Sequence, residues 1–361
     1  MNEGMIRFLG HLTAEAPIQV SYPDMDGKLP RTPHGEALLN GGTLRGPLRK
    51  SALRAMRRLL ANAKGVPEKG LLSLTDEYML GSGIDRTRAV NNEKAEGVDP
   101  VGEQLLRELN PLLSLFGRWN LPSRLEASEL RTDGGNVMTV GQGVRHDQFA
   151  RDPESVEVLS DDDRDALLRE ARSARESAVA IEEIRREIAK TKRAYGAAAD
   201  SGDKAETKRL GTQLNELQEK EKAVRAEREG AEHSIQHPLA GFEAIAPGSR
   251  LSARLGLING RQAYLGILLH ALADFAREPV LGGHRNIGAG QVSGSFDVFQ
   301  WPVGELKASK IGSVSFDDMG FYMEGDVLQA AFDAVADPET LNGWNLHTHT
   351  IEDARKLAGD K

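Results

Sequence analysis

The sequence predicts a protein of mixed α+β class that carries a long antiparallel helical hairpin. Residues 293–299 alternate between apolar and polar side chains, which is typical of a half-buried strand. Residues 44–59 and 262–278 instead repeat apolar residues three and four positions apart, which indicates helices with one buried face. Residues 161–232 carry a charge at 34 of 72 positions, 16 basic and 18 acidic. This segment therefore differs in kind from the rest of the chain.

Composition narrows the classes of function. The 361 residues suggest about two domains, or one core with large insertions. The absence of cysteine excludes disulfides, thiolate catalysis and Cys-ligated zinc. With no apolar run of membrane-spanning length and no secretion signal at the start, we expect a cytoplasmic protein. The net charge of -8 argues against coating nucleic acid by bulk charge, but it leaves room for a localised basic groove.

A short apolar strand near residue 38 leads into Gly41, Gly42 and Thr43, and a helix follows. Glycines at a strand-to-helix turn expose N–H groups at the positive end of a helix dipole, so this turn is a candidate phosphate site. Pro47 suits the first turn of that helix. The spacing matches neither a P-loop nor the dinucleotide fingerprint.

The helix that begins here is basic, because residues 41–64 contain seven Lys and Arg residues and no acid. Its apolar 3/4 spacing turns Arg45, Arg49, Arg54 and Arg58 away from the buried face. A basic surface without nearby acids is expected if a bound phosphodiester backbone supplies the counter-ions. The alternative is that these arginines pair with acids from elsewhere in the fold.

The charge-rich segment 161–232 has the pattern of two helices that pair along apolar a and d positions. Apolar residues recur at spacings of 3, 4 and 7 from Ile181 to Tyr195, and of 4, 3 and 7 from Leu210 to Val224. Gly202 can end the first helix and Asp203 can cap the second. The hairpin is either a solvated spacer or an arm that docks a partner or clamps nucleic acid.

A second glycine cluster, LGGHRNIGAGQVS at 281–293, follows the helix at 262–278 and precedes the last predicted strand. Its glycines allow close approach to another backbone, while His284, Arg285 and Asn286 supply side-chain donors. Neither glycine cluster contains Phe, Tyr or Trp, so base stacking of the aromatic type is not predicted.

Taken in this order, these segments resemble the RAMP superfamily of CRISPR-associated proteins, and within it the backbone subunit that polymerises along the guide RNA of class 1 effector complexes. Residues 42–49 (GTLRGPLR) match the family's glycine–Ser/Thr–basic signature, and 282–290 match its C-terminal glycine loop. The turns at 144–147 and 246–249 look like the family's central strand pair, and 6–12 like its first strand. The divergent insertions look most like type IV, and types III and I remain open.

The resemblance implies a ferredoxin-like (RRM-type) palm with helical finger and thumb insertions. The implied parts are a first palm segment (1–60), a finger-like insertion (61–130), palm or thumb strands (131–160), the hairpin (161–235), a second palm segment (236–300) and a C-terminal extension (301–361). The residues expected to contact RNA are Gly41, Gly42, Thr43, Arg45, Arg49, Lys50, Arg54, Arg145, His146, Gly282, Gly283, His284, Arg285 and Asn286.

The same resemblance implies partners: guide RNA (crRNA), copies of this chain in a head-to-tail filament, other CRISPR effector subunits, and target DNA or RNA paired to the guide. Residues 136–146 are a candidate thumb contribution that interrupts the guide–target duplex. The expected function is guide binding for target recognition in antiviral and anti-plasmid defence. We expect no catalysis, no cofactor, no metal and no membrane association.

Three alternatives remain open. Type III relatives cut target RNA with an aspartate in the region that holds Asp24 and Asp26 here, although Pro-Asp-x-Asp-Gly is also an ordinary turn composition. His347 and His349 would share a strand face and could bind a metal, but a surface tail is the favoured interpretation. Finally, the chain could be a coiled-coil adaptor that acts through 161–232.

Overall fold

The computed structural model describes residues 4–22, 25, 27–84, 99–118, 120–134, 137–141, 160–200, 203–227 and 241–359. The chain divides into two compact units. The first unit holds residues 1–141 and 241–361, and the second, residues 142–240, is inserted into it. In the part of the chain that is described, no helix is long and apolar enough to cross a membrane.

The first unit is built on an antiparallel sheet with the strand order β10-β9-β8-β1-β7-β4-β2, and β3 pairs with β7 beside β4. Its central strand places Phe8 opposite Leu255 on one side and Val298 on the other. The strands are β1 (Met5–Ala14), β2 (Leu38–Leu39), β3 (Leu125–Ala127), β4 (Leu130–Thr132), β7 (Arg250–Leu257), β8 (Val292–Trp301), β9 (Ser309–Asp317) and β10 (Gly320–Glu324). The prediction of a mixed α+β protein is confirmed.

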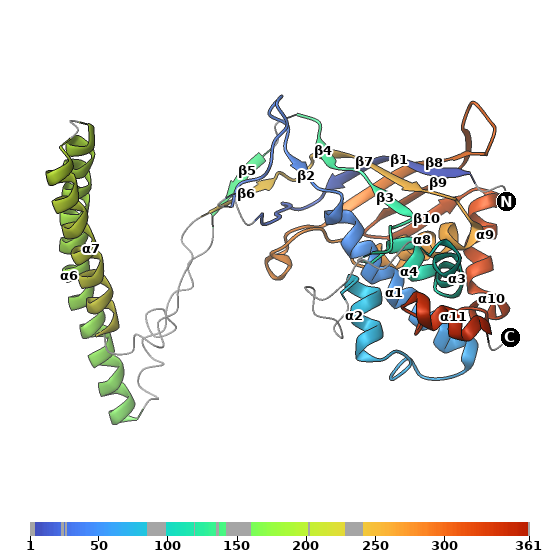
Figure 1. The fold of residues 1–361 in the computed structure, drawn as a ribbon, viewed down its shortest axis with the longest axis horizontal. Coiled ribbons are helices and arrows are strands. Elements are labelled where there is room, and N and C mark those ends of the chain that lie inside the picture. The colour runs from blue at the N-terminus through green and yellow to red at the C-terminus, as the bar shows by residue number, and fades with distance from the viewer. Residues whose placement is uncertain are drawn as a thin grey trace. The chain divides into compact units, whose positions relative to one another are not determined.

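Two helices connect the central strands. Along the chain the order is β1, α1 (Gly42–Lys64), β4, β7, α8 (Gln262–Phe275) and β8. In the sheet, β7 lies between β1 and β4, and β1 lies between β7 and β8. Helix α8 therefore connects β7 to β8 across β1, whereas α1 follows the edge strand β2 in the connection from β1 to β4, and both helices cover the same face of the sheet (Figure 1).

The core lies between this sheet face and its helices. Phe8 and Leu255 from the sheet and Leu48 and Leu268 from α1 and α8 are fully buried. Burial of each such side chain contributes about 1.5–3 kcal/mol. A third helix, α9 (Asp326–Ala336), packs on α8 and on β9.

Shorter helices pack against α1 or against one another. They are α2 (Leu74–Ser82), α3 (Pro100–Leu109), α4 (Pro111–Phe116), α10 (Pro338–Asn342) and α11 (Ile351–Gly359). Asn110, between α3 and α4, is fully buried, and its amide donates to the carbonyls of Leu346 (3.2 Å) and Thr348 (2.9 Å). The C-terminal segment is thus bonded into the region of 61–130 rather than extending away from it.

A separate two-stranded sheet pairs β5 (Val137–Val140) with β6 (Phe242–Ile245). The N–H of Ile18 donates to the carbonyl of Ile245 at 3.1 Å, which ties the segment after β1 to β6. Between β6 and β7 the chain turns at Gly248, whose φ of 80° favours glycine.

The second unit contains two helices, α6 (Asp161–Asp200) and α7 (Lys204–Ala226). They pair along the apolar seam, where Ile184, Ile188 and Leu217 form a small buried cluster. Asp203 caps α7 by accepting hydrogen bonds from the N–H groups of Ala205 and Glu206, as the sequence predicted. Charged side chains such as Arg186 and Arg209 lie exposed on the hairpin, together with apolar Val179.

Candidate nucleic-acid interface

The first part of the candidate interface is the start of α1. Gly41 lies so close to the end of β3 that an added Cβ would be 2.2 Å from the carbonyl oxygen of Ala127. Its role is therefore close backbone packing. The helix begins at Gly42, earlier than expected, so Pro47 lies inside α1 and the prediction of a first-turn proline is wrong.

The amide groups at this helix start are only partly satisfied. Asn40 caps the turn, because its Oδ1 accepts the N–H of Thr43 at 3.2 Å. The N–H of the exposed residue Gly42 has no acceptor among the described residues. One donor at the positive end of the helix dipole thus remains open to an anion.

The second part is the glycine loop after α8. Two backbone hydrogen bonds hold this loop against the segment after β1. The N–H of Gly283 donates to the carbonyl of Gln19 at 2.8 Å, and the N–H of Gly290 donates to the carbonyl of Pro17 at 2.9 Å. Gly282 has a φ of 79°, and a Cβ there would be 2.1 Å from the Gln19 oxygen. Only glycine allows this approach.

The residues at the tip of the loop are exposed, and each makes different contacts. His284 adopts a φ of 59° and stacks on Phe242, with ring centroids 4.4 Å apart. Arg285 forms an ion pair with Glu278 on the surface. Asn286 is exposed, and its side chain has no partner in the described part of the chain.

One short segment brings the two glycine clusters together. Gln19 contacts the glycine loop, and three residues later the hydroxyl of Tyr22 accepts the N–H of Asn40 at 3.2 Å, just before α1. Three residues of extended chain span at most about 11 Å. The two clusters, far apart in the sequence, therefore lie on the same side of the first unit.

Most of the basic residues on α1 hold the fold together. The Arg45 guanidinium donates to the carbonyl of Phe116. Arg49 is buried and donates to the carbonyls of Met79 (2.7 Å) and Leu80. Burial, together with the nearby Arg45, lowers the pKa of Arg49 to about 10, so it keeps its charge at neutral pH.

The arginines farther along α1 have acidic partners, which is the alternative that the sequence left open. Arg54 and Arg58 both pair with Asp274 of α8, whose side chain is only 3% exposed. Arg57 pairs with Glu68 and Glu77. Lys50 is exposed, and no side-chain partner is found for it among the described residues.

Several predicted residues lie outside the part that the structure describes. These are Arg145 and His146 of the expected RNA contact, Asn136 at the start of the candidate thumb segment, and Asp24 and Asp26 of the alternative catalytic loop.

The structure adds a set of residues that sequence reasoning missed. The sheet face opposite the helices carries exposed Arg250 and Arg254 on β7, and Arg7 on β1 lies over the ring of Trp301, 5.3 Å from its centroid. Arg250 bonds the ring of His11 at 3.0 Å, and partial burial together with Arg250 lowers the pKa of His11. The available signal was the run of polar residues at every second position, Arg250, Ser252 and Arg254, which places them on one face of a strand.

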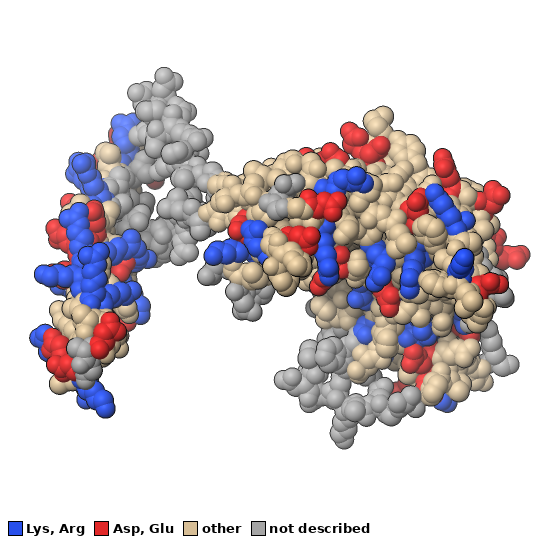
Figure 2. Space-filling model, turned by 90° about the horizontal axis from the view of Figure 1, so that it is seen from above, with Lys and Arg blue, Asp and Glu red and all other residues tan. Residues whose placement is uncertain are grey.

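This open face is not uniformly basic. In the view from above, Lys and Arg side chains are interspersed with Asp and Glu (Figure 2). For example, Lys310 pairs with Asp297 at 2.8 Å, and Arg131 pairs with Glu129 at 3.0 Å.

The two C-terminal histidines do not lie in a surface tail, so that expectation is wrong. His349 is buried, and Asp76 of α2 contacts both His347 Nδ1 (2.8 Å) and His349 Nε2 (3.2 Å). Although burial alone would raise the pKa of Asp76, hydrogen bonds from Ser73 and His347 lower it. Within the described residues, no group of three or more His, Asp or Glu side chains is placed to hold a metal ion.

Comparison with known proteins yields matches among solved structures. No protein-family model matches the chain, and no curated protein matches it. A structure described as a type IV-B CRISPR complex matches with a TM-score of 0.32 and 16% identity, over 84% of this chain and 93% of that one. Csc2 of Thermofilum pendens matches with a TM-score of 0.31 and 9% identity, over 99% and 75%.

Proposed function

We propose that this chain is a backbone subunit of a CRISPR ribonucleoprotein, most similar to type IV, that binds guide RNA without cutting it. The RNA-binding surface consists of the start of α1 and the tip of the glycine loop, including Gly42, Lys50 and Asn286. The observation that carries the proposal is that the segment 17–22 bonds both the glycine loop and Asn40, the residue before Gly41. This supports placing the two motifs that resemble the RAMP family in one surface.

The proposed palm is ferredoxin-like. The strand order β8-β1-β7-β4, with α1 and α8 as crossovers on one face, follows the split β-α-β topology of that fold. On such a palm, RNA would be held at its phosphates and sugars, because the exposed donors are backbone N–H groups, an amide and a lysine ammonium. Contacts of this kind position a strand and leave its base edges free to pair with a target.

The polymer on RNA is the second element of the proposal. Copies of the chain would stack head to tail along the guide, together with other effector subunits. An acidic total charge, with most of the described arginines of α1 bonded within the fold, would limit binding of unrelated nucleic acid.

Purification under low salt tests the proposal. The full chain is expected to carry cellular RNA of uniform length and to protect regular intervals of it from nuclease. A folded chain that carries no RNA and does not bind a single-stranded RNA at low salt would overturn it.

Two further experiments separate the alternatives. The assembled particle is expected to leave complementary RNA intact; regularly spaced cuts, lost in Asp24→Ala or Asp26→Ala, would show that it is a nuclease. Replacing residues 161–226 with a short linker is expected to preserve RNA binding. If binding is lost while the sheet unit stays folded, the interface lies on the hairpin.

A further inference from the structure

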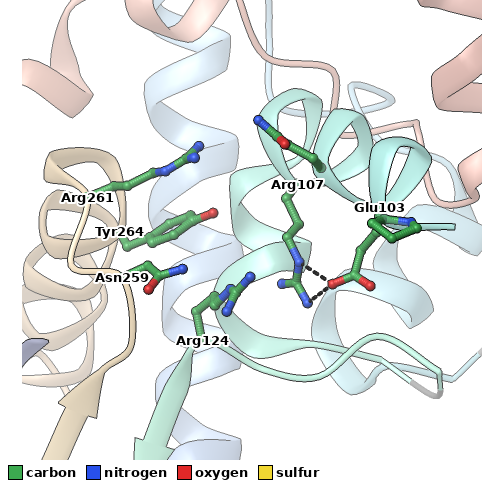
Figure 3. A pocket seen from close by; sticks show the side chains of 8 residues that line it. Glu103, Arg107, Arg124, Asn259, Arg261 and Tyr264 are labelled. Atoms are coloured by element: carbon green, nitrogen blue, oxygen red, sulfur yellow. Dashed lines mark hydrogen bonds and ion pairs between the residues drawn. The ribbon is translucent and has the colours of Figure 1, made fainter. Parts of the chain in front are cut away.

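A polar cavity of about 380 Å³ lies in the first unit, and no residue of either glycine cluster lines it. It is formed by α3, the residue before β3, the turn between β7 and α8, and the start of α8 (Figure 3). The side chains that matter here are Glu103, Arg107, Arg124, Asn259, Arg261 and Tyr264. Three arginines therefore face one small space, and none of them belongs to the proposed guide interface.

On one wall of the cavity, the polar side chains already have hydrogen-bond partners within the protein. Arg107 is 6% exposed and donates to Glu103 (2.7 Å), to the hydroxyl of Ser114 (3.1 Å) and to the carbonyl of Pro122 (2.9 Å). Tyr264 shares a hydrogen bond of 2.8 Å with the same Ser114 hydroxyl. The carboxylate of Glu103 is thus already neutralised by Arg107.

On the other wall, two side-chain donor groups have no acceptor among the described residues. Arg124 is half-buried, and neither its guanidinium nor the amide of Asn259 has a partner among the described residues. Figure 3 shows the Arg124 side chain between Asn259 and the Arg107–Glu103 pair. The backbone of Arg124 is fixed, since its N–H donates to Ser114 at 3.1 Å and its carbonyl accepts from Ile258 at 2.9 Å.

The charge balance of the cavity is positive. Arg261 forms an ion pair with Glu108 at 3.8 Å, and Glu103 is the single acid among the residues that line the space. A cation would be repelled here, and an apolar ligand would leave the guanidinium and the amide without partners. An anion would satisfy both.

We propose that this cavity binds a phosphate group. A guanidinium presents a planar pair of N–H donors that matches two phosphate oxygens, and Arg124 is the group free to do so. Asn259 would donate to a third oxygen, and Arg261 would supply charge from the start of α8. The volume is within the range of small-ligand sites, about 300–1,000 Å³, so a phosphate ester fits with part of its alcohol.

The direct test is calorimetric titration of the full chain with inorganic phosphate at low ionic strength. Arg124→Ala is expected to weaken phosphate binding by about 10-fold or more, the usual loss for a hydrogen bond to a charged group. Asn259→Gly, which keeps the left-handed backbone (φ 53°), is expected to weaken it less. The matched control is Arg277→Ala, which removes an exposed arginine just after the far end of α8 and is expected to change nothing.

The outcomes are distinct. Absence of binding to the wild-type chain, or equal binding by Arg124→Ala and Arg277→Ala, would overturn the proposal. Acetate serves as a second ligand: if it binds as tightly as phosphate, the cavity is a general anion site and the phosphate assignment is wrong. None of these measurements uses RNA, so their outcome does not depend on whether the guide-binding proposal is correct.

A second arm identifies the source of the phosphate. If single-stranded RNA with a 5′-phosphate binds the wild-type chain more tightly than the same RNA with a 5′-hydroxyl, and Arg124→Ala removes that difference, the ligand is a terminal phosphate. If Arg124→Ala weakens both RNAs equally, it is the RNA backbone. If only inorganic phosphate or AMP distinguishes the variant, the cavity takes a free phosphate compound.

Discussion

The ring of His284 lies parallel to the ring of Phe242, with 4° between the planes and 4.4 Å between the centroids. His284 comes from the exposed tip of the glycine loop and Phe242 from the buried side of β6. The stack holds the loop tip in place although His284 has a positive φ of 59°, which is unfavourable for a residue with a side chain.

Two substitutions separate the ring from the backbone. His284→Gly loses the stack, worth about 0.5–1.5 kcal/mol, but relieves the left-handed conformation. His284→Ala loses the same stack and keeps the backbone cost of about 1–2 kcal/mol. We therefore expect His284→Ala to be the less stable of the two in urea unfolding. Equal stabilities would show that the loop rearranges freely.

Asp274 is the acid on which the basic face of α1 depends. Because it is buried and pairs with both Arg54 and Arg58, Asp274→Asn should lower the free energy of unfolding by about 1–3 kcal/mol. Asp297→Asn is the matched control, since its exposed pair with Lys310 should be worth less than about 1 kcal/mol. Equal losses in urea midpoint would mean that the two arginines are satisfied by water.

Asp76 should make the free energy of unfolding depend on pH in the acidic range. Its pKa is lowered in the folded chain, so its contribution is present above the unfolded value of 3.8 and is lost as pH falls through the folded value. We expect the wild-type chain to lose stability between about pH 5 and pH 3 more steeply than Asp76→Asn. His347→Gln should fall between them, because Ser73 still bonds the carboxylate. Parallel pH profiles for all three chains would contradict this.

The elements that could be predicted from the sequence have a local signal. The alternation at 293–299 and the 3/4 spacing at 262–278 became β8 and α8, and the a/d seam became the contact between α6 and α7. Caps such as Asp203 are equally local, because the side chain bonds N–H groups two and three residues away.

Partners that are distant in the chain could not be predicted. Nothing near Arg54 indicates Asp274, and nothing near His347 indicates Asp76, because the packing of α8 and α2 against other segments creates both contacts. The acid-free run of 41–64 therefore suggested a more open basic surface than the folded chain has. Strands β9 and β10 were also missed, although 309–324 contain a hairpin that pairs Val314 with Met323.

The interface itself predicts which cations contribute to the salt dependence of RNA binding. Each phosphate contact by a lysine or arginine releases counter-ions, so losing one contact should reduce the slope of log K against log salt by about one unit. Lys50 is exposed and available for such a contact, whereas Arg49 is buried and donates to two carbonyls. We expect Lys50→Ala to reduce the slope and to leave the urea midpoint unchanged.

Arg49→Ala should do the opposite. It is expected to lower the unfolding midpoint, because the carbonyls of Met79 and Leu80 lose their buried donor, while the slope changes little in the fraction that remains folded. Lys64→Ala, at the far end of α1 and about 21 Å along the helix from Lys50, is the matched control and should change neither quantity appreciably. If Lys64→Ala reduces the slope as much as Lys50→Ala, RNA binds along the whole helix by charge alone, and the glycine clusters do not determine where it lies.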